Sequence, residues 1–284
     1  MKRSMANKKI KLGILGADGN MGQLISKLAI EDGGFEIVLA NTIPESKNLG
    51  KDIGNLVGNE AIGTKITTIK QLQTDLKEKK PQIIIDFTVA KATEMNAPVI
   101  IQNGISMVIG TTGMTDEFYG EFEALCEENG VVSVLASNMA TGVNIFFKMA
   151  KEIAKYVEGW DIEIIEKHHH RKRDSPSGTA LTTAKKIAEA LGKDLKNVAK
   201  YGRNKGPNPR KIGSEEIGIH SVRGGDIVGD HTVLYAGPGE RIELIHRAHS
   251  RECFASGALK AAKFLIENEH TDTVFDMQDV LNLT

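Results

Sequence analysis

The fold is decided by the stretch IKLGILGADGNMG at residues 10–22, where a short apolar run leads into a glycine-rich turn. Residues 10–15 are typical of a buried strand, and an amphipathic helical pattern begins near residue 21. Between strand and helix the glycines follow the spacing G-x-x-G-x-x-G. A strand, a glycine turn and a helix in this order predict the start of a doubly wound α/β fold with a parallel sheet.

The same turn predicts a site for the diphosphate of a dinucleotide. Backbone amides at a helix N-terminus bind such an anion, and glycines keep side chains out of its way. Asp18 stands where a middle glycine is common, and its carboxylate would repel a diphosphate unless it turned away. We therefore expect Asp18 either to cap the helix or to weaken cofactor binding. The alternative is an ordinary glycine-rich turn without a ligand.

Outward from the turn, short apolar runs alternate with helical patterns as far as residue 136. We predict strands at 10–15, 36–40, 82–87, 107–109 and 131–136, and helices at 21–31, 69–79, 91–103 and 115–129. Polar residues follow two of these strands, DFT at 86–88 and GTTG at 110–113. Because ligands bind outside the carboxyl ends of parallel strands, we expect both segments to face the glycine turn.

The end of the second strand normally carries the residue that selects the ribose of the cofactor. Here the sequence is NTIP at residues 41–44, with no acid, and Lys47 follows shortly after. A 2′-phosphate is therefore not excluded, and the choice between NADH and NADPH stays open.

From about residue 141 the pattern changes to that of a second, α+β region. We predict helices at 145–156 and 180–191, strands at 161–166, 217–222, 231–235 and 241–247, and a last helix at 253–267. The strands suit an open, mixed and mostly antiparallel sheet. The last helix is expected to pack back on the first region.

Composition narrows the class of protein. The 284 residues carry 36 Lys+Arg against 37 Asp+Glu, so no overall charge predicts nucleic acid or a membrane surface as a partner. Two cysteines without metal-binding or redox spacing favour a reducing cytoplasm. The basic residues 1–9 are expected to be a solvated, frayed start, and the apolar run after them is too short for a signal peptide or a membrane span. We expect a soluble protein that is not exported.

The most informative stretch is EKHHHRKRDSPSGT at residues 166–179, in which six of the seven residues from 167 to 173 are basic or imidazole. Ser177 can cap the next helix and leave the amides of Gly178 and Thr179 free, which is a carboxylate site. A second anion can be held by Lys172 or a histidine, so the pattern predicts a small dicarboxylate ligand. A histidine here also suits a general acid.

Three other interpretations of this stretch fit its residues less well. Consecutive histidines point in different directions, and no acidic or cysteine partner has suitable spacing, so we expect no metal site. The run is internal and too short for a purification tag. A nucleic-acid patch would need interleaved aromatic residues, which are absent from the stretch. For the whole chain, a semialdehyde dehydrogenase and a non-catalytic nucleotide sensor are the alternative functions; neither cysteine lies in a loop typical of a nucleophile.

Taken in order, several motifs resemble the dihydrodipicolinate reductase family over nearly the whole chain. They are GADGNMG, DFT, GTTG, ASNMATGVN, HHHRKRDSPSGT and VRGGDIVGDHT. The resemblance implies NADH- or NADPH-dependent reduction of 4-hydroxy-tetrahydrodipicolinate (dihydrodipicolinate) to tetrahydrodipicolinate in lysine and diaminopimelate biosynthesis. It also implies a cytoplasmic homotetramer. The implied domains are a Rossmann-like dinucleotide-binding domain at 1–140 and 250–284, completed by the C-terminal helix, and a substrate-binding and tetramerisation domain at 141–249.

The same resemblance assigns roles to residues. It implies that His168 is the proton donor or acceptor and Lys172 a second catalytic group, and it places Arg251 near the site. Substrate contacts are implied for His169, Ser177, Gly178 and Thr179. Cofactor contacts are implied for Gly16, Ala17, Asp18, Gly19, Asn20, Met21, Gly110, Thr111, Thr112, Ala136, Ser137, Asn138 and Met139. The sequence departs from the family, which often has glycine at Asp18, arginine at Asn20 and a charged residue near Thr42.

Overall fold

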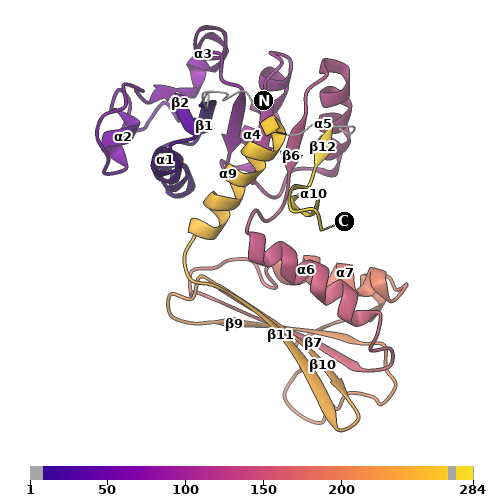
Figure 1. The fold of residues 1–284 in the computed structure, drawn as a ribbon. Coiled ribbons are helices and arrows are strands. Elements are labelled where there is room, and N and C mark those ends of the chain that lie inside the picture. The colour runs from indigo at the N-terminus through magenta and orange to yellow at the C-terminus, as the bar shows by residue number, and fades with distance from the viewer. Residues whose placement is uncertain (1–8, 268–272, 284) are drawn as a thin grey trace, which may run out of the picture. The chain divides into compact units, whose positions relative to one another are not determined.

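The computed structural model describes residues 9–267 and 273–283. The basic start of the chain, apart from residue 9, lies outside the described residues. The chain forms two compact units, which we call unit 1 (Met1–Ala140 with Glu252–Thr284) and unit 2 (Thr141–Arg251). Figure 1 shows the elements of each unit.

Unit 1 is built on a seven-stranded sheet in the order β12-β6-β5-β4-β1-β2-β3. All of its strand pairs are parallel. The strands are β1 (Ile10–Leu15), β2 (Phe35–Thr42), β3 (Thr67–Thr68), β4 (Ile83–Asp86), β5 (Ser106–Ile109), β6 (Ser133–Leu135) and β12 (Val274–Phe275). The carboxyl ends of β1, β4 and β5 therefore lie at one edge of the sheet, as the sequence predicts.

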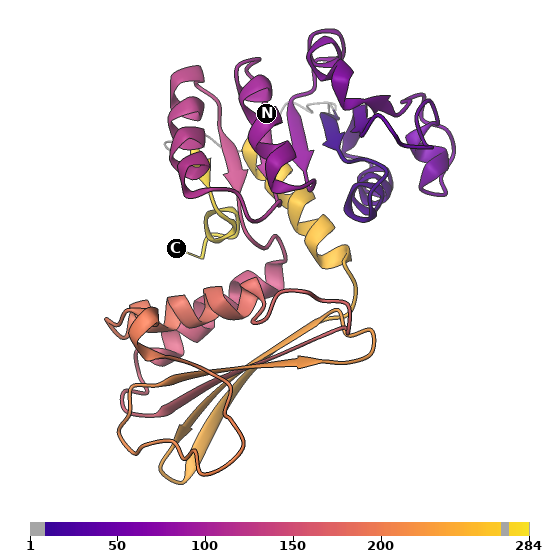
Figure 2. The ribbon, with the colours of Figure 1, turned by 180° about the vertical axis from the view of Figure 1, so that it is seen from behind.

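Helices cover both faces of this sheet. Ile83 and Ile85 of β4 share a core with α1 (Asn20–Asp32) and α9 (Glu252–Glu267). Ile84, which points the other way along the strand, shares a core with α3, α4 and α5. Figures 1 and 2 show α9 on one side of the sheet and α4 and α5 on the other. The doubly wound, Rossmann-like fold predicted from the glycine turn is confirmed.

The remaining elements of unit 1 are short or lie on the second face. They are α2 (Ile53–Leu56), a 3₁₀ turn η1 (Ile69–Gln71), α3 (Leu72–Lys79), α4 (Ala90–Ile101), α5 (Asp116–Asn129) and α10 (Met277–Val280).

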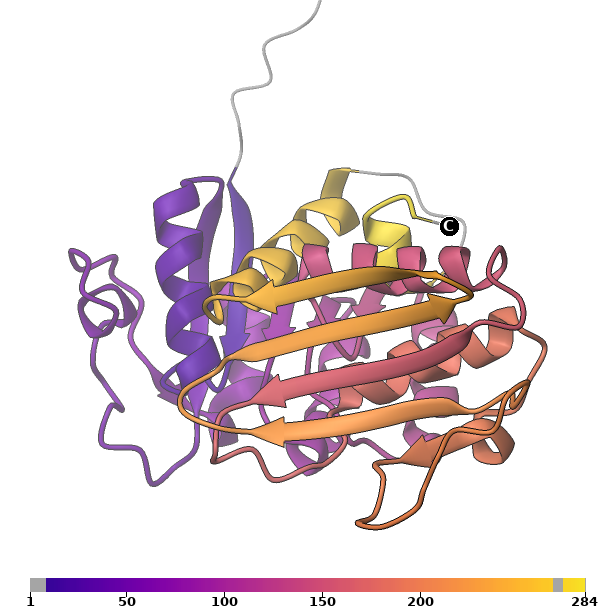
Figure 3. The ribbon, with the colours of Figure 1, turned by 90° about the horizontal axis from the view of Figure 1, so that it is seen from below.

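Unit 2 is a five-stranded sheet in the order β11-β10-β7-β9-β8 with two longer helices. The strands are β7 (Asp161–His168), β8 (Ala199–Tyr201), β9 (Ile217–Arg223), β10 (Gly229–Gly237) and β11 (Glu240–Ala248); the helices are α6 (Thr141–Ala154), α7 (Gly178–Ala190) and α8 (Leu195–Val198). Figure 3 shows β11, β10, β7 and β9 side by side, with no helix in front of them.

The prediction of a mostly antiparallel sheet in unit 2 is wrong. β10 is antiparallel to β11 and β7, but β9 is parallel to both β7 and β8. The reason is that α7 and α8 link β7 to β8 as a crossover, and a β-α-β connection returns the chain in the same direction. Residues 202–216 then bring the chain back, so that β9 also runs parallel to both. Two strand pairs of this sheet are antiparallel and two are parallel.

Candidate active site

The glycine turn of unit 1 has the geometry of an anion site. Gly16 follows β1 with φ at +65°, a conformation that favours glycine. Gly19 caps α1 without offering a side chain to the opening amides. A Cβ on Gly22 would overlap the carbonyl oxygen of Gly16, so α1 starts against the turn only because Gly22 has none. The amides that open α1 are therefore left for a ligand such as a diphosphate.

Asp18 does not cap α1, so the first of the two alternatives for this residue is wrong. Its carboxylate turns to the loop after β2, where it accepts hydrogen bonds from the hydroxyls of Thr42 and Ser46 and from the amide of Asn48. Burial alone would raise the pKa of Asp18, but these hydrogen bonds outweigh it and lower the pKa. The carboxylate is therefore ionised and engaged away from the helix start.

The ends of β4 and β5 meet beside the glycine turn. Asp86 is fully buried and accepts hydrogen bonds from the backbone and the hydroxyl of Thr88, at 2.8 and 2.7 Å. The Gly110 amide donates to the Asp86 carbonyl at 3.0 Å, and Thr111 lies 3.4 Å from the Asp86 carboxylate. A Cβ on Gly16 would lie 3.0 Å from the Thr88 methyl group. The predicted meeting of the three strand ends is confirmed.

The other residues with an implied cofactor role lie at these same ends. Thr112 follows Thr111 and is exposed, and residues 136–139 follow β6. The Ala136 amide donates to the carbonyl of Ile109 on β5, at 3.1 Å. Met139 is buried, and the close approach of Gly257 on α9 to its carbonyl leaves no room for a Cβ. These segments thus form one edge of unit 1.

His168 is the centre of a buried charged cluster in unit 2. Alternation along β7 puts Glu166 and His168 on the buried face, with exposed fractions of 0 and 7 %. The Nδ1 of His168 lies 2.5 Å from Oε2 of Glu166. Arg223, at the end of β9, donates to both carboxylate oxygens of Glu166 at 2.8 Å. Such a bidentate pair holds the carboxylate in one orientation.

The electrostatics of this cluster fix which nitrogen of His168 can react. Burial would raise the pKa of Glu166, but hydrogen bonds from Arg223 and His168 lower it to about 2. Burial lowers the pKa of His168, although Glu166 opposes the shift. The ionised Glu166 can only accept, so Nδ1 carries the hydrogen and Nε2 is the reactive atom. A Cβ on Gly229 would lie 3.1 Å from Nε2, so glycine there keeps that atom accessible.

Ser177 joins the start of α7 to the same cluster. Its hydroxyl accepts from the Ala180 amide at 3.2 Å, which confirms the predicted cap, and lies 3.1 Å from His231 Nε2. Its backbone amide donates to Glu166 at 3.1 Å. The beginning of α7 is thus held beside His168 by both the backbone and the side chain of one residue.

The amide of Gly178 is not left free, contrary to the expectation. It donates to the carboxylate of Asp174, which also pairs with Lys172 at 2.9 Å. Burial would raise the pKa of Asp174, but Lys172 and Gly178 lower it. Lys172 and the Gly178 amide, which were predicted to bind a carboxylate of the ligand, therefore already bind the carboxylate of Asp174. Thr179, next to Gly178, belongs to the first turn of α7.

His169 and Arg251 also lie in this region of unit 2. The His169 amide donates to the carbonyl of Ile227 at 2.7 Å. Desolvation and then the cations Arg171 and Arg251 lower the pKa of His169, which puts Arg251 within electrostatic reach. The resemblance placed Arg251 near the site.

Three members of the cluster were missed from the sequence: Glu166, Arg223 and His231. Glu166 lies two residues before His168, and a strand puts residues so spaced on one face. This two-residue alternation of a strand is the signal from which Glu166 could have been identified. His231 sits on β10 with its ring 5.2 Å from that of His168, and no sequence pattern gave this strand pairing.

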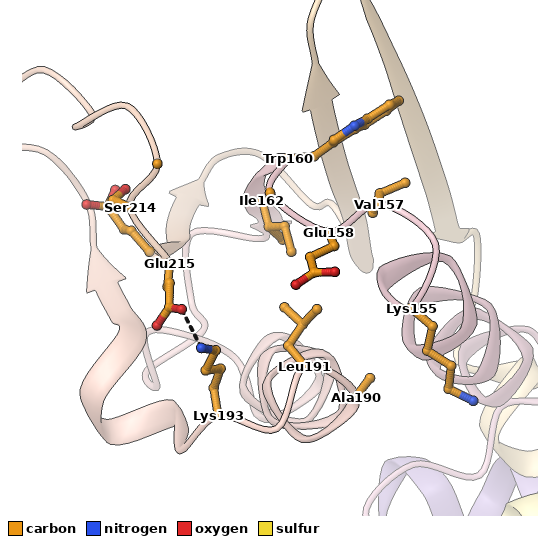
Figure 4. A pocket seen from close by; sticks show the side chains of 13 residues that line it. Lys155, Val157, Glu158, Trp160, Ile162, Ala190, Leu191, Lys193, Ser214 and Glu215 are labelled. Atoms are coloured by element: carbon orange, nitrogen blue, oxygen red, sulfur yellow. Dashed lines mark hydrogen bonds and ion pairs between the residues drawn. The ribbon is translucent and has the colours of Figure 1, made fainter.

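A separate cavity of about 430 Å³ lies near the start of β7. Figure 4 shows Trp160, Ile162 and Leu191 around it, with Lys193 and Glu215 bonded to each other at its edge. Seven residues of strand, roughly 20 Å, separate Asp161 from His168 at the other end of β7. None of the predicted site residues lines this cavity, so it is not part of the cluster.

The side chains and helices of the described residues, and one thiol, bear on the alternative interpretations. Among residues 9–267 and 273–283, no group of three His, Cys, Asp or Glu side chains could hold a metal ion. Over the same residues, no helix has the length and apolar character needed to cross a membrane. Burial raises the pKa of Cys126 to about 11, which is unsuited to the thiolate nucleophile of an acylating dehydrogenase.

A Rossmann-like unit and an α+β unit with a buried histidine–carboxylate pair define a nicotinamide-dependent oxidoreductase of two units. The family models described as dihydrodipicolinate reductase, N-terminus and C-terminus, match residues 10–139 and 142–281. The chain therefore belongs to the dihydrodipicolinate reductase family.

Relatives and a solved structure agree with that family. The 4-hydroxy-tetrahydrodipicolinate reductase of Methanococcoides burtonii is 46% identical over 96% of this chain and 99% of its own length. That of Methanocaldococcus jannaschii is 44% identical over 96% and 98%. A dipicolinate-bound dihydrodipicolinate reductase from Paenisporosarcina sp. TG-14 superposes with a TM-score of 0.73, at 26% identity, over 96% of this chain and 99% of that one.

Proposed function

We propose that this protein reduces 4-hydroxy-tetrahydrodipicolinate to tetrahydrodipicolinate with NADH or NADPH, in lysine and diaminopimelate biosynthesis. Unit 1 binds the dinucleotide through the glycine turn and the ends of β4, β5 and β6. Unit 2 binds the dicarboxylate and supplies the proton. One observation carries the proposal: in a chain of this family, a buried Glu166–Arg223 pair fixes His168 beside the capped start of α7.

His168 handles the proton in this proposal. When bound, the nicotinamide supplies hydride to a conjugated carbon of the cyclic substrate, and negative charge moves toward the ring nitrogen. Imidazolium His168 then gives its Nε2 proton to the reduced ring system. Glu166 stabilises that imidazolium, because its ionised carboxylate accepts from Nδ1 at 2.5 Å. Since burial lowers the pKa of His168 below its usual 6.5, the rate through the acid form should already fall as pH rises through the acidic range toward neutrality.

Lys172 and the first amides of α7 bind the substrate carboxylate in this proposal. The support is Asp174, whose carboxylate now pairs with Lys172 and the Gly178 amide. Asp174 is 58 % exposed at its side chain, so it can swing out when a substrate carboxylate arrives. The Lys172 ammonium and the helix N-terminus then favour the charge that develops during reduction.

We also propose that the protein is a cytoplasmic homotetramer that pairs through the sheet of unit 2. Val222 and Ile245, each 45 % exposed, lie on the same face of this sheet, opposite the face that carries Glu166 and His168. An uncovered sheet face with such side chains suits a second copy of the same face. Light scattering should give four times the 30.9 kDa chain mass, and Ile245→Asp should lower it. A monomeric wild type would contradict the tetramer. The two free cysteines fit a reducing compartment.

The activity is tested by following NADH and NADPH absorbance with the condensation product of pyruvate and aspartate semialdehyde. Oxidation of either cofactor that depends on both components supports the proposal. A purified, folded protein that oxidises neither cofactor contradicts it.

A further inference from the structure

Two differences from the usual dinucleotide-binding pattern lie at one place in unit 1. One is Asp18 in the glycine turn, and the other is the lack of an acidic residue at the end of β2. In a dinucleotide-binding βαβ unit, an acid near the end of the second strand accepts a hydrogen bond from the ribose 2′-hydroxyl. Here β2 ends at Thr42, which is 3 % exposed and has no charge. The Asp18 carboxylate bonds to the hydroxyl of Thr42. A carboxylate is therefore present at the end of β2, although it comes from the glycine turn.

The bonding of Asp18 leaves its charge without a cationic partner. Its Oδ1 accepts from Thr42, its Oδ2 accepts from Ser46 and Asn48, and its own backbone amide also donates to the carboxylate. The bond from Asn48 is long, at 3.4 Å, so a ligand hydroxyl can take its place. Within residues 9–267 and 273–283, no lysine or arginine pairs with Asp18. Lys51 bonds to the carbonyl oxygen of Asn48 instead, at 2.9 Å.

We propose that Asp18 binds the adenosine ribose of the cofactor and makes the protein select NADH over NADPH. This inference rests on the proposed reductase function and adds the choice of cofactor. A 2′-hydroxyl can donate to the carboxylate in place of the Asn48 amide. A 2′-phosphate has no hydroxyl there and would place about two negative charges beside an unpaired carboxylate.

The surroundings of Asp18 fit this role. The preceding turn leaves the opening amides of α1 for the diphosphate, so the adenosine ribose lies next along the cofactor toward β2. Ile43, directly after β2, is 61 % exposed and offers the adenosine an apolar surface. Thr42, Ser46 and Asn48 hold the carboxylate in one orientation before the cofactor arrives.

The test is isothermal titration of NADH and of NADPH into the full chain without substrate. We expect wild type to bind NADH at least tenfold more tightly than NADPH, since a charge-assisted hydrogen bond is lost and a repulsion is added. Asp18→Asn removes the charge at almost constant size and should cut this ratio to about threefold or less. Glu31→Gln, which removes one negative charge near the other end of α1, should keep the wild-type ratio.

A second variant controls for a rearrangement of the loop after β2 when Asp18 is replaced. Asp18→Gly/Thr42→Glu moves the acid to the end of β2 and should restore a preference for NADH that Asp18→Gly alone lacks. Equal binding of both cofactors by wild type, or a ratio unchanged in Asp18→Asn, overturns the proposal while leaving the reductase function intact. If wild type binds neither cofactor, the reductase function itself fails.

Discussion

The glycine turn of unit 1 and the histidine segment of unit 2 prepare for their ligands in opposite ways. In the turn, Gly16, Gly19 and Gly22 remove side chains so that backbone amides remain exposed. In the segment, Glu166, Arg223 and His168 build a buried charged network around one ring nitrogen. The turn binds its ligand because side chains are absent, whereas the segment depends on charged groups whose burial costs free energy.

This difference explains why the two regions carry different amounts of information. Many α/β proteins need a glycine turn, so the turn predicts a fold better than a reaction. A buried charge is costly unless it is paired, so the network around His168 indicates a functional site more specifically than a glycine turn does. Substitution should therefore cost more stability in the network of unit 2 than in the glycine turn of unit 1.

The largest effect is expected from breaking the network of unit 2. Glu166→Gln leaves the Arg223 guanidinium beside a buried neutral side chain, which should cost about 3–5 kcal/mol of unfolding free energy. Trp160, the single tryptophan and a residue of unit 2, reports this unfolding by its fluorescence in urea. Glu166→Gln/Arg223→Met removes both charges and should recover part of the loss. A loss below about 1 kcal/mol in the single variant would mean that the pair is not needed.

A smaller effect is expected from filling the glycine turn of unit 1. Gly22→Ala pushes a methyl group into the carbonyl of Gly16, which should destabilise by about 1–3 kcal/mol and weaken NADH binding. Gly120→Ala is the matched control, because a Cβ there meets nothing within 4 Å on α5. It should be neutral or stabilise by about 0.5–1 kcal/mol. Thermal unfolding by circular dichroism compares the two, and equal effects would refute the steric account.

The smallest effect is a pH dependence that belongs to unit 2. Burial, followed by the neighbouring His168, lowers the pKa of His231 to about 3. Between about pH 3 and 6.5 the unfolded chain binds a proton on His231 that the folded chain does not, so stability falls as pH falls. Going from pH 7 to pH 5.5 should cost about 1 kcal/mol in Trp160-detected urea unfolding. His231→Gln should flatten this dependence, and an unchanged slope would contradict the assignment.

Periodicity predicted the longer elements of both units, because their apolar residues repeat over enough positions to define a strand or a helix. β1 was predicted as found, and Ser177 set the start of α7 through its cap. The two- to four-residue elements β3, β8, β12, α2, α8 and α10 were missed, because they show neither a period nor the apolar run that predicted the similarly short β4, β5 and β6. They form through pairing and capping, not through a local pattern.

In the candidate site, contacts between distant residues could not be predicted. Arg223 is 57 positions from Glu166, and their bond depends on the parallel register of β9 with β7. The direction of the Asp18 side chain likewise depends on a loop 24 to 30 positions later. Residues close in sequence, such as His168 and Ser177, were identified because their motif is local.

The central claim is that His168 transfers the proton in a reductase that binds its cofactor elsewhere. The most direct test measures, in the same His168→Gln preparation, cofactor oxidation with the pyruvate and aspartate-semialdehyde condensation product and NADH affinity by titration. We expect kcat to fall by about 10²–10⁴ while the Kd for NADH stays within about twofold of wild type. An unchanged kcat, or equal losses in kcat and in NADH affinity, would contradict it.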